Sequence, residues 1–188
     1  MHIPIERSHF DKSKTSNLSS NPIVTINIAN VHLRPPVDLD GTASLKTARK
    51  TEPIRTGEVK ELIRRAALIK EEGLSAPFHI TAGDLNEGDN VGALRHLQIL
   101  GYIDALQEYV PTSKETHTWP FMRNLWTLRK RLDHILWHEG PLATKFKEDG
   151  ELGRSVKIQC LGCGVMTGYE KDASDHQPVL SRFAIIKG

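Results

Sequence analysis

The sequence predicts one layered domain of mixed α/β architecture. Short segments rich in β-branched residues alternate with two stretches of helical periodicity, and the C-terminal third continues with strand-like segments that no long helix separates. The composition agrees, because a chain of 188 residues with 38% hydrophobic and 26% charged residues is long enough for one core and shows no bias toward disorder. We expect a flexible leader over 1–21, rich in Ser, Asn and Lys, and one globular domain over 22–188.

The first predicted strand and helix lie near the N-terminus. IVTINIA (23–29) has the composition of a short buried strand, and the two prolines of the following NVHLRPP prevent its continuation, so a long loop is expected next. From Thr56 to Gly73, apolar residues recur at three- and four-residue steps, which predicts an amphipathic helix with a glycine stop. The apolar positions are Val59, Leu62, Ile63, Ala66 and Ile69.

A second strand and helix follow, and then a run of strands. FHITAG (78–83) reads as a strand, and Asp89 is a candidate N-cap for a helix that ends before Gly101. The inward positions of that helix are Val91, Leu94, Leu97 and Leu100. The remaining strands are expected over 132–137, 156–160 and 179–186.

The net charge of the chain, formally +2, is too small to attract nucleic acid or an anionic membrane through an overall electrostatic field. Lys and Arg number 25 against 23 Asp and Glu, so any affinity for nucleic acid or an anionic membrane must come from a local patch. No apolar run approaches the roughly 18 to 20 residues that span a bilayer, and the first ten residues lack the pattern of a signal peptide. We expect a soluble intracellular protein, cytoplasmic or nuclear.

The two cysteines do not by themselves predict a metal site. Cys160 and Cys163 form half of a zinc ribbon, which needs two further ligands, and no Cys-His spacing supplies them. Ordinary reduced thiols near a strand are the favoured interpretation.

Acidic, amide and imidazole side chains gather at the predicted strand ends. They are His32 after the first strand, Asp84 and Asn86 after the second, Asp133 at the start of the third, and Asp175 and His176 before the last. Clustered carboxylates need a compensating cation or proton, so a pocket built from Asp84, Asp133 and Asp175 would favour Mg²⁺ or Mn²⁺. Imidazoles can exchange protons near neutral pH, so carboxylates, a bound cation and imidazoles together could hydrolyse a phosphate ester.

Five motifs carry this pattern in order. They are NVHL (30–33), GDLN (83–86), TWP (118–120), RLDHIL (131–136) and SDHQPV (174–179). Together they resemble the second half of the endonuclease/exonuclease/phosphatase superfamily, whose type member is pancreatic deoxyribonuclease. The resemblance covers roughly 22–187 and implies a deoxyribonuclease I-like four-layer α/β sandwich, incomplete at its N-terminal end.

The resemblance also implies a role for each matching residue. Asp84 would align or activate the attacking water, and Asn86 would contact the scissile phosphate. Asp175 would be a metal ligand and His176 would stabilise the transition state, with Asp133 holding the ring of His176 in its tautomer.

Further residues are candidate substrate contacts. The resemblance implies that His32 and Asn30 face the same phosphate. Among the basic and aromatic residues of 119–131, Trp119, Arg129 and Arg131 would suit a phosphate backbone and a stacked base. The resemblance implies nucleic acid, a phosphoinositide or another phosphodiester as the substrate. Inositol polyphosphate phosphatases of the family carry a cysteine at the position matching RLDHIL, and its lack here favours a nuclease.

Structural interpretations of the same residues stay open. Asp84 and Asn86 also suit a turn after a strand, and Asp133 could simply pair with Arg131. His32 could be a strand-end histidine with a satisfied hydrogen bond, and Asp175 with His176 could form a solvated loop.

One principal feature of the family has no match in its expected place. Members carry a metal-binding Glu in an LQE-like motif upstream of NVHL, whereas Glu108 lies downstream of GDLN and Asn27 reads as an ordinary strand residue. An incomplete sandwich would expose apolar surface that a partner chain could cover. The rival hypothesis is therefore a catalytically inactive remnant that acts as a binding module.

Overall fold

The computed structural model describes residues 23–36, 45–68, 79–88, 91–110, 118–123, 126–139, 143–145, 156–166 and 174–187. Within these ranges the protein is a mixed α/β structure with one four-stranded and three two-stranded sheets, which confirms the predicted class. The expected leader over 1–21, the expected helix end at Gly73 and the candidate cap Asp89 lie outside the described residues.

The four-stranded sheet forms the centre of the molecule. Its order is β2 (Ile28–His32), β3 (Ile80–Asp84), β7 (Asp133–His138) and β4 (Tyr102–Asp104). β2 runs parallel to β3, while β7 is antiparallel to both β3 and β4. The end of β2, the end of β3 and the start of β7 therefore meet at one edge of the sheet, where the predicted site residues lie.

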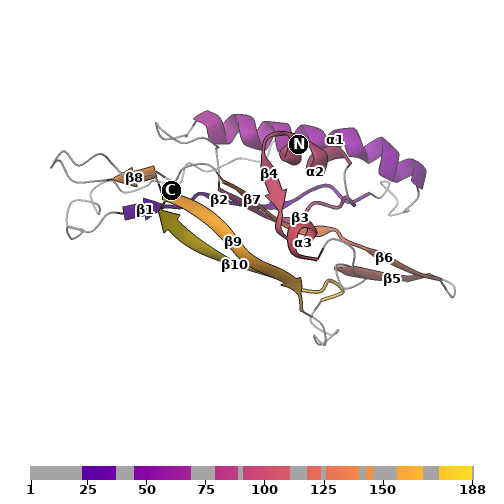
Figure 1. Cartoon of the computed structure of the whole chain (residues 1–188). Coiled ribbons are helices and arrows are strands. Elements are labelled where there is room, and N and C mark those ends of the chain that lie inside the picture. Colours follow the sequence, from indigo (N-terminus) through magenta and orange to yellow (C-terminus); the bar gives the residue numbers. More distant parts are fainter. Residues whose placement is uncertain are drawn as a thin grey trace.

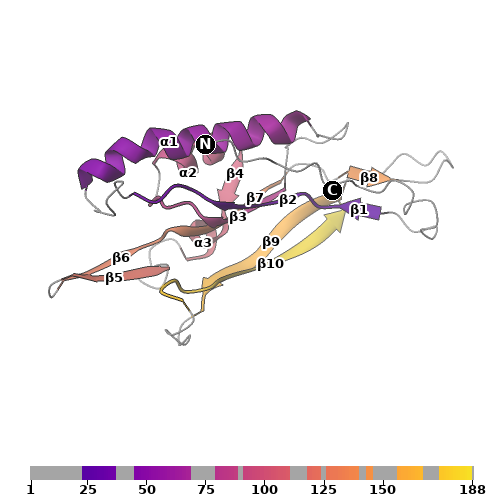
Figure 2. The ribbon, with the colours of Figure 1, turned by 180° about the vertical axis from the view of Figure 1, so that it is seen from behind.

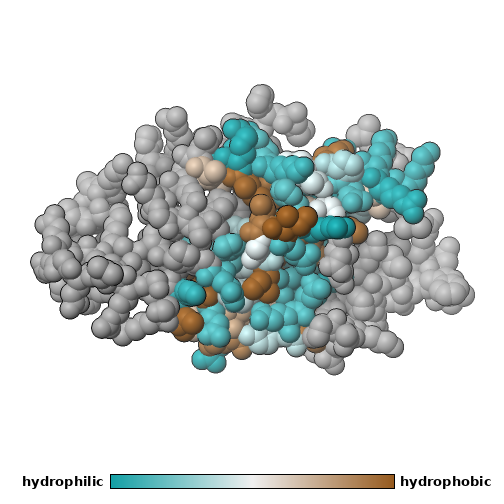
Figure 3. Space-filling view, turned by 45° about the horizontal axis from the view of Figure 1, so that its top comes forward, coloured by the Kyte–Doolittle hydropathy of each residue, from teal (hydrophilic) through white to brown (hydrophobic). Residues whose placement is uncertain are grey.

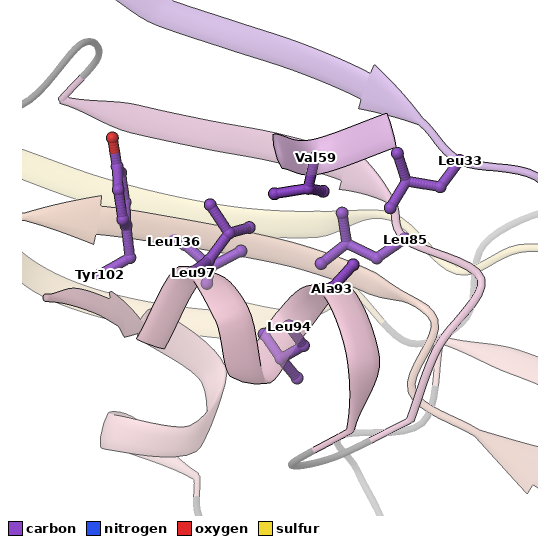
Figure 4. Packing of buried hydrophobic residues seen from close by; sticks show 8 residues of the cluster. All are labelled: Leu33, Val59, Leu85, Ala93, Leu94, Leu97, Tyr102 and Leu136. Carbon is purple, nitrogen blue, oxygen red and sulfur yellow. The ribbon is translucent and has the colours of Figure 1, made fainter. Parts of the chain in front are cut away.

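Two helices cover one face of this sheet (Figures 1 and 2). They are α1 (Leu45–Leu68) and α2 (Gly92–Ile99). Figure 4 shows the side chains that pack between helices and sheet: Leu33, Val59, Leu85, Ala93, Leu94, Leu97, Tyr102 and Leu136. Each fully buried leucine in such a cluster contributes about 1.5–3 kcal/mol relative to an exposed one. Two of the inward positions predicted for the second helix, Leu94 and Leu97, are buried as expected, whereas Val91 and Leu100 are exposed.

A hairpin and a short helix cover the opposite face. β9 (Val156–Val165) and β10 (Val179–Lys187) pair antiparallel, and α3 (Ala105–Tyr109) lies beside them. The second core cluster contains Ile80, Ala105, Trp137, Ile158 and Cys160. The described residues thus form three layers, helices over sheet over hairpin, and the fourth layer of the predicted sandwich stays a prediction (Figure 1).

The first helix corrects the sequence-based expectation of a long loop before Thr56. α1 begins at Leu45 and contains Pro53, which lacks a backbone N–H and lies exposed. The added turns bury polar residues, Thr47, Thr51 and Arg55, instead of apolar ones. Hydrophobic periodicity could not detect these turns because their inward face is polar.

The first strand also differs from its prediction. It divides into β1 (Ile23–Thr25), which pairs with β8 (Ala143–Lys145), and β2. Between them, Asn27 leaves the ladder: its N–H donates to Nδ1 of His79 at 3.0 Å and its carbonyl accepts from the N–H of His79 at 2.8 Å.

The two cysteines are free thiols packed against the second core cluster. Burial raises the pKa of both Cys160 and Cys163. Protonated thiols are poor nucleophiles and poor metal ligands, so this environment fits the interpretation of ordinary reduced cysteines.

The described surface is largely hydrophilic in the view of Figure 3, with hydrophobic side chains in small groups. The most exposed large hydrophobic residues are Ile28, Ile99 and Leu180, on three different elements. A partner chain that would cover apolar surface stays a prediction. Among the described residues, no helix is both long and apolar enough to cross a membrane.

Candidate functional site

Three predicted site residues lie side by side on neighbouring strands. His32 is the register partner of Asp84 across β2 and β3, and Asp84 is the partner of Asp133 across β3 and β7. Because residues in register share one face of a sheet, their side chains project to the same side. That side faces the β9–β10 hairpin, since Ile80 of the same face belongs to the second core cluster and Ile135 packs against it.

His176 enters this row from the segment that precedes β10. Its Nδ1 lies 2.7 Å from Oδ2 of Asp133, and its Nε2 lies 4.0 Å from Oδ2 of Asp84. Nε2 of His32 lies 3.8 Å from the same oxygen of Asp84. The carboxylate of Asp133 thus orients the ring by accepting a hydrogen bond from Nδ1–H, and Nε2 is left facing Asp84. The alternative pairing of Asp133 with Arg131 is not what the structure shows.

Thr118 fixes the two segments that carry this pair. Its Oγ1 accepts hydrogen bonds from the N–H groups of Leu132 and Asp133 at 3.0 and 3.1 Å. Its carbonyl accepts from the N–H of Gln177 at 2.7 Å. Thr118 is fully buried, so the start of β7 and the residue after His176 share one rigid anchor.

The electrostatics of the site favour a cation or a proton near Asp84. Burial raises the pKa of Asp84 first, and the charge of the neighbouring Asp133 raises it further. The hydrogen bond from the N–H of Asn86 acts in the opposite direction but does not offset burial. A carboxyl in this position takes up a proton more readily than an exposed one, unless a bound cation supplies the compensating charge.

Asn86 occupies a backbone conformation that few residue types adopt. Its φ is +51°, in the left-handed region, which asparagine tolerates better than most residues. Its N–H donates to Oδ1 of Asp84 at 2.7 Å, and its Nδ2 donates to the carbonyl of Leu33 at 2.9 Å. The turn interpretation and the functional one are therefore compatible: the turn points the amide toward the end of β2.

A cavity of about 340 Å³ opens beside the Asp133–His176 pair. Polar residues from three segments line it: Asn30 from β2, Asp133 from β7, and Ser174 and Gln177 from the segment around His176. The cavity places Asn30 on the same side as the site.

One group among the described residues could hold a metal ion: Asp84, Asp133 and His176, whose ligand atoms all lie within 4.8 Å of one another. Two carboxylate oxygens suit a hard divalent cation, while an imidazole is a less usual ligand for Mg²⁺. The bond between Nδ1 of His176 and Asp133 leaves Nε2 as the ring atom that could reach the ion, but the preference of Mg²⁺ for oxygen ligands favours the carboxylates of Asp84 and Asp133. Asp175 is exposed and lies outside this group.

Comparisons with known proteins return structures alone. No family model matches the chain, and no curated protein matches it. TDP2 from D. rerio, in complex with a single strand DNA product, is 16% identical with a TM-score of 0.46, and covers 76% of this chain and 53% of its own. TDP2 from C. elegans is 18% identical with a TM-score of 0.44, and covers 81% of this chain and 40% of its own.

These likenesses assign no family. At TM-scores below 0.5 they carry no functional argument, and the chain spans about half of these structures or less. The function must be argued from the site itself.

The remaining predicted substrate contacts divide into two kinds. Arg131 is buried, with a side chain that is 5% exposed and an Nη2 that lies 3.6 Å from Oδ2 of Asp104. This burial and the contact with Asp104 favour a structural role for Arg131, and its contact with a substrate stays a prediction. Trp119 and Arg129 belong to the hairpin of β5 (Trp119–Arg123) and β6 (Trp126–Lys130), but their side chains lie outside the described residues.

Glu108, the candidate look-alike of the family's metal ligand, lies away from the metal-binding group. It is on α3, where its Oε2 accepts a hydrogen bond from Nε1 of Trp137 at 3.3 Å. Nothing in this geometry brings it to the row of His32, Asp84 and Asp133.

A buried polar cluster beneath the site was not anticipated from the sequence. Nδ1 of His134 lies 2.7 Å from Oδ2 of Asp104, and its Nε2 lies 3.2 Å from the carbonyl of Glu87. Both ring nitrogens of His134 therefore face oxygen atoms. Asp104 also caps α3 by accepting from the N–H groups of Leu106 and Gln107.

Replacing Asp104 by asparagine is expected to lower the free energy of unfolding by about 3 kcal/mol at pH 7, because a buried charge pair loses one partner. Burial alone would raise the pKa of Asp104, but the hydrogen bond and charge of His134, together with Arg131, hold it below its ordinary 3.8. A lowered folded-state pKa contributes stability above the unfolded-state pKa and loses it as pH falls through the folded value. Urea unfolding should therefore show a difference that shrinks below about pH 4.

The matched control is Glu139→Gln at the exposed position directly after β7, which should change the free energy of unfolding by less than about 0.5 kcal/mol. An Asp104→Asn variant as stable as this control would contradict the assignment of Asp104 as a buried charge partner.

Proposed function

We propose that this chain is a divalent-metal-dependent phosphoesterase that hydrolyses phosphodiesters in the manner of a nuclease. One observation carries the proposal: the strand register sets His32, Asp84 and Asp133 in one row, with the ring of His176 bonded to Asp133 and facing Asp84. A carboxylate–imidazole pair beside a second carboxylate of raised pKa is the chemistry that activating a water molecule requires.

The roles follow from what each atom can donate or accept. Asp84 accepts the proton of the attacking water, directly or by orienting it. His176, held by Asp133, donates from Nε2 to the negative charge that develops on the phosphoryl oxygens. Asn86 has two amide hydrogens and uses one on Leu33, so the second is available to a phosphate oxygen.

Two residues of β2 complete the substrate side. The side chain of His32 is 73% exposed beside Asp84, so it can donate to a phosphate or to the leaving oxygen. Asn30 lines the adjoining cavity. Trp119 and Arg129 are proposed as contacts to the nucleic acid beyond the scissile bond.

The carboxylates would hold the cation. Asp84 and Asp133 offer oxygens to Mg²⁺ or Mn²⁺, and we propose Asp175 as a further ligand by resemblance to the family. When bound, the ion would neutralise phosphoryl charge, and the neighbouring carboxylates would no longer repel each other.

Hydrolysis with and without metal tests the proposal. The purified chain should cleave a simple phosphodiester and DNA or RNA only with Mg²⁺ or Mn²⁺, and Asp84→Asn should lower kcat about a hundredfold, the contribution of one positioned base. Burial raises the pKa of Asp84 in the metal-free protein, and a cation bound beside its carboxylate would lower that pKa. Wild-type activity should therefore fall at acidic pH, and the midpoint of that fall should move to lower pH as the metal concentration rises. The Asn variant should lose this acidic limb.

Two outcomes would contradict hydrolysis at this site. One is equal cleavage by wild type and Asp84→Asn. The other is no cleavage of DNA, RNA, phosphoinositide or the simple diester at saturating metal, and salt-sensitive binding of nucleic acid in that case would favour the inactive binding module.

A further inference from the structure

Asn86 needs support that its own turn does not provide. A non-glycine residue at φ +51° persists only where its surroundings hold it, and the bond from Nδ2 to Leu33 restrains the side chain at a single point. The next residue, Glu87, makes the contacts that hold this part of the chain in place.

Glu87 is tied to three elements at once, although its side chain is fully buried. Its Oε1 accepts from Nε of Arg55 on α1 at 2.7 Å, and its Oε2 accepts from the N–H groups of Ala93 and Leu94 at the start of α2. Its carbonyl faces Nε2 of His134 on β7 at 3.2 Å.

The start of α2 is shaped to receive this carboxylate. Gly92 has φ +48°, and a Cβ there would collide with both carboxylate oxygens of Glu87. Glycine is thus required for the close approach of the side chain to the helix.

Arg55 connects the same carboxylate to the loop after β2. Its Nη1 donates to Oγ1 of Thr51 at 2.8 Å and reaches the carbonyl of Arg34 at 3.5 Å. Arg34 follows Leu33, whose carbonyl receives the amide of Asn86. One ion pair therefore connects the segment directly after β2, which ends at His32, with the turn that contains Asn86.

A buried ion pair adds little net stability to a fold, because the cost of desolvation offsets most of the attraction. We therefore expect a second role for the pair between Glu87 and Arg55. We propose that Glu87 and Arg55 are positioning residues, which hold the amide of Asn86 at the angle that the phosphate requires. This inference rests on the proposed hydrolysis and assigns to it two residues that make no contact with the site row.

A double-mutant cycle on hydrolysis tests the inference. Glu87→Gln keeps the shape of the side chain and removes its charge, and should lower kcat about tenfold with KM changed less than about twofold. In an Asn86→Ala background the same change should cost less than about twofold, because the residue through which it acts is gone. Glu61→Gln is the control: Glu61 also pairs with arginine on α1 but is solvent-exposed, and its replacement should leave kcat unchanged.

A measurement independent of activity separates failure of this inference from failure of the proposed function. In Glu87→Gln, the side-chain amide resonances of Asn86 should shift while those of Asn30 stay in place. If the wild type proves inactive, the resonances alone decide. If Glu87→Gln is unstable, Arg55→Lys is measured instead. Losses that multiply in the double variant, or unmoved resonances of Asn86, would overturn the inference.

Discussion

Replacing His176 by alanine is expected to lower kcat for phosphodiester hydrolysis by about 10³ to 10⁴-fold, near the upper range for one acid–base group. The ring is the only imidazole within 3 Å of the Asp133 carboxylate among the contacts of the described residues. Its loss removes the ring nitrogen Nε2 that faces Asp84 and the partner that Nδ1 provides to the carboxylate of Asp133. Single-turnover cleavage at saturating metal measures the chemical step.

A double-mutant cycle with Asp133 tests more directly whether His176 acts in the oriented form that Asp133 provides. If Asp133 acts by orienting the ring, Asp133→Asn should lower kcat in the wild type but add little in the His176→Ala background. His96→Ala is the matched control, because His96 lies on α2, on the helix side of the sheet. A His176→Ala variant that retained activity like that of His96→Ala would exclude the imidazole from the reaction.

The residues of this row could be predicted from the sequence because each is a polar residue at or near the end of a recognisable strand. Asp84 ends β3 and Asn86 lies in the turn after it, whereas Asp133 begins the apolar strand β7 and His176 precedes β10. The end of a strand fixes which edge of the sheet a residue reaches. Their proximity still rested on resemblance, and the register of β2, β3 and β7 now supplies it directly.

The support beneath the row could not be predicted in the same way. Arg55 and Glu87 are 32 residues apart in the sequence, and His134 and Asp104 are 30 apart. A charged side chain in a single sequence reads as exposed by default, because most are. Only tertiary contacts reveal that these four residues are interior. The first turns of α1 were missed for the same reason, because their buried side chains are polar.

Replacing Gly83 by alanine is expected to destabilise the protein by about 4 kcal/mol or more, among the largest effects of a single substitution. Gly83 precedes Asp84 on β3 and pairs in register with Val31 of β2. A Cβ at this position would collide with the backbone carbonyl of Val31, and the φ of Gly83 is +136°, which alanine rarely adopts. The two nearest atoms belong to the backbone carbonyl of Val31, so the collision cannot be relieved by moving a flexible side chain aside.

Relief of that collision requires β2 to separate from β3, and the register shared by His32 and Asp84 lies one residue away. Activity should therefore fall together with the melting temperature. Gly57→Ala is the control, and it is expected to raise the stability instead of lowering it. Gly57 lies inside α1 with no atom within 4 Å of an added Cβ. Helix propensity predicts that this variant gains about 0.5–1 kcal/mol. Equal melting temperatures for the two variants would show that β2 and β3 do not approach as closely as the register indicates.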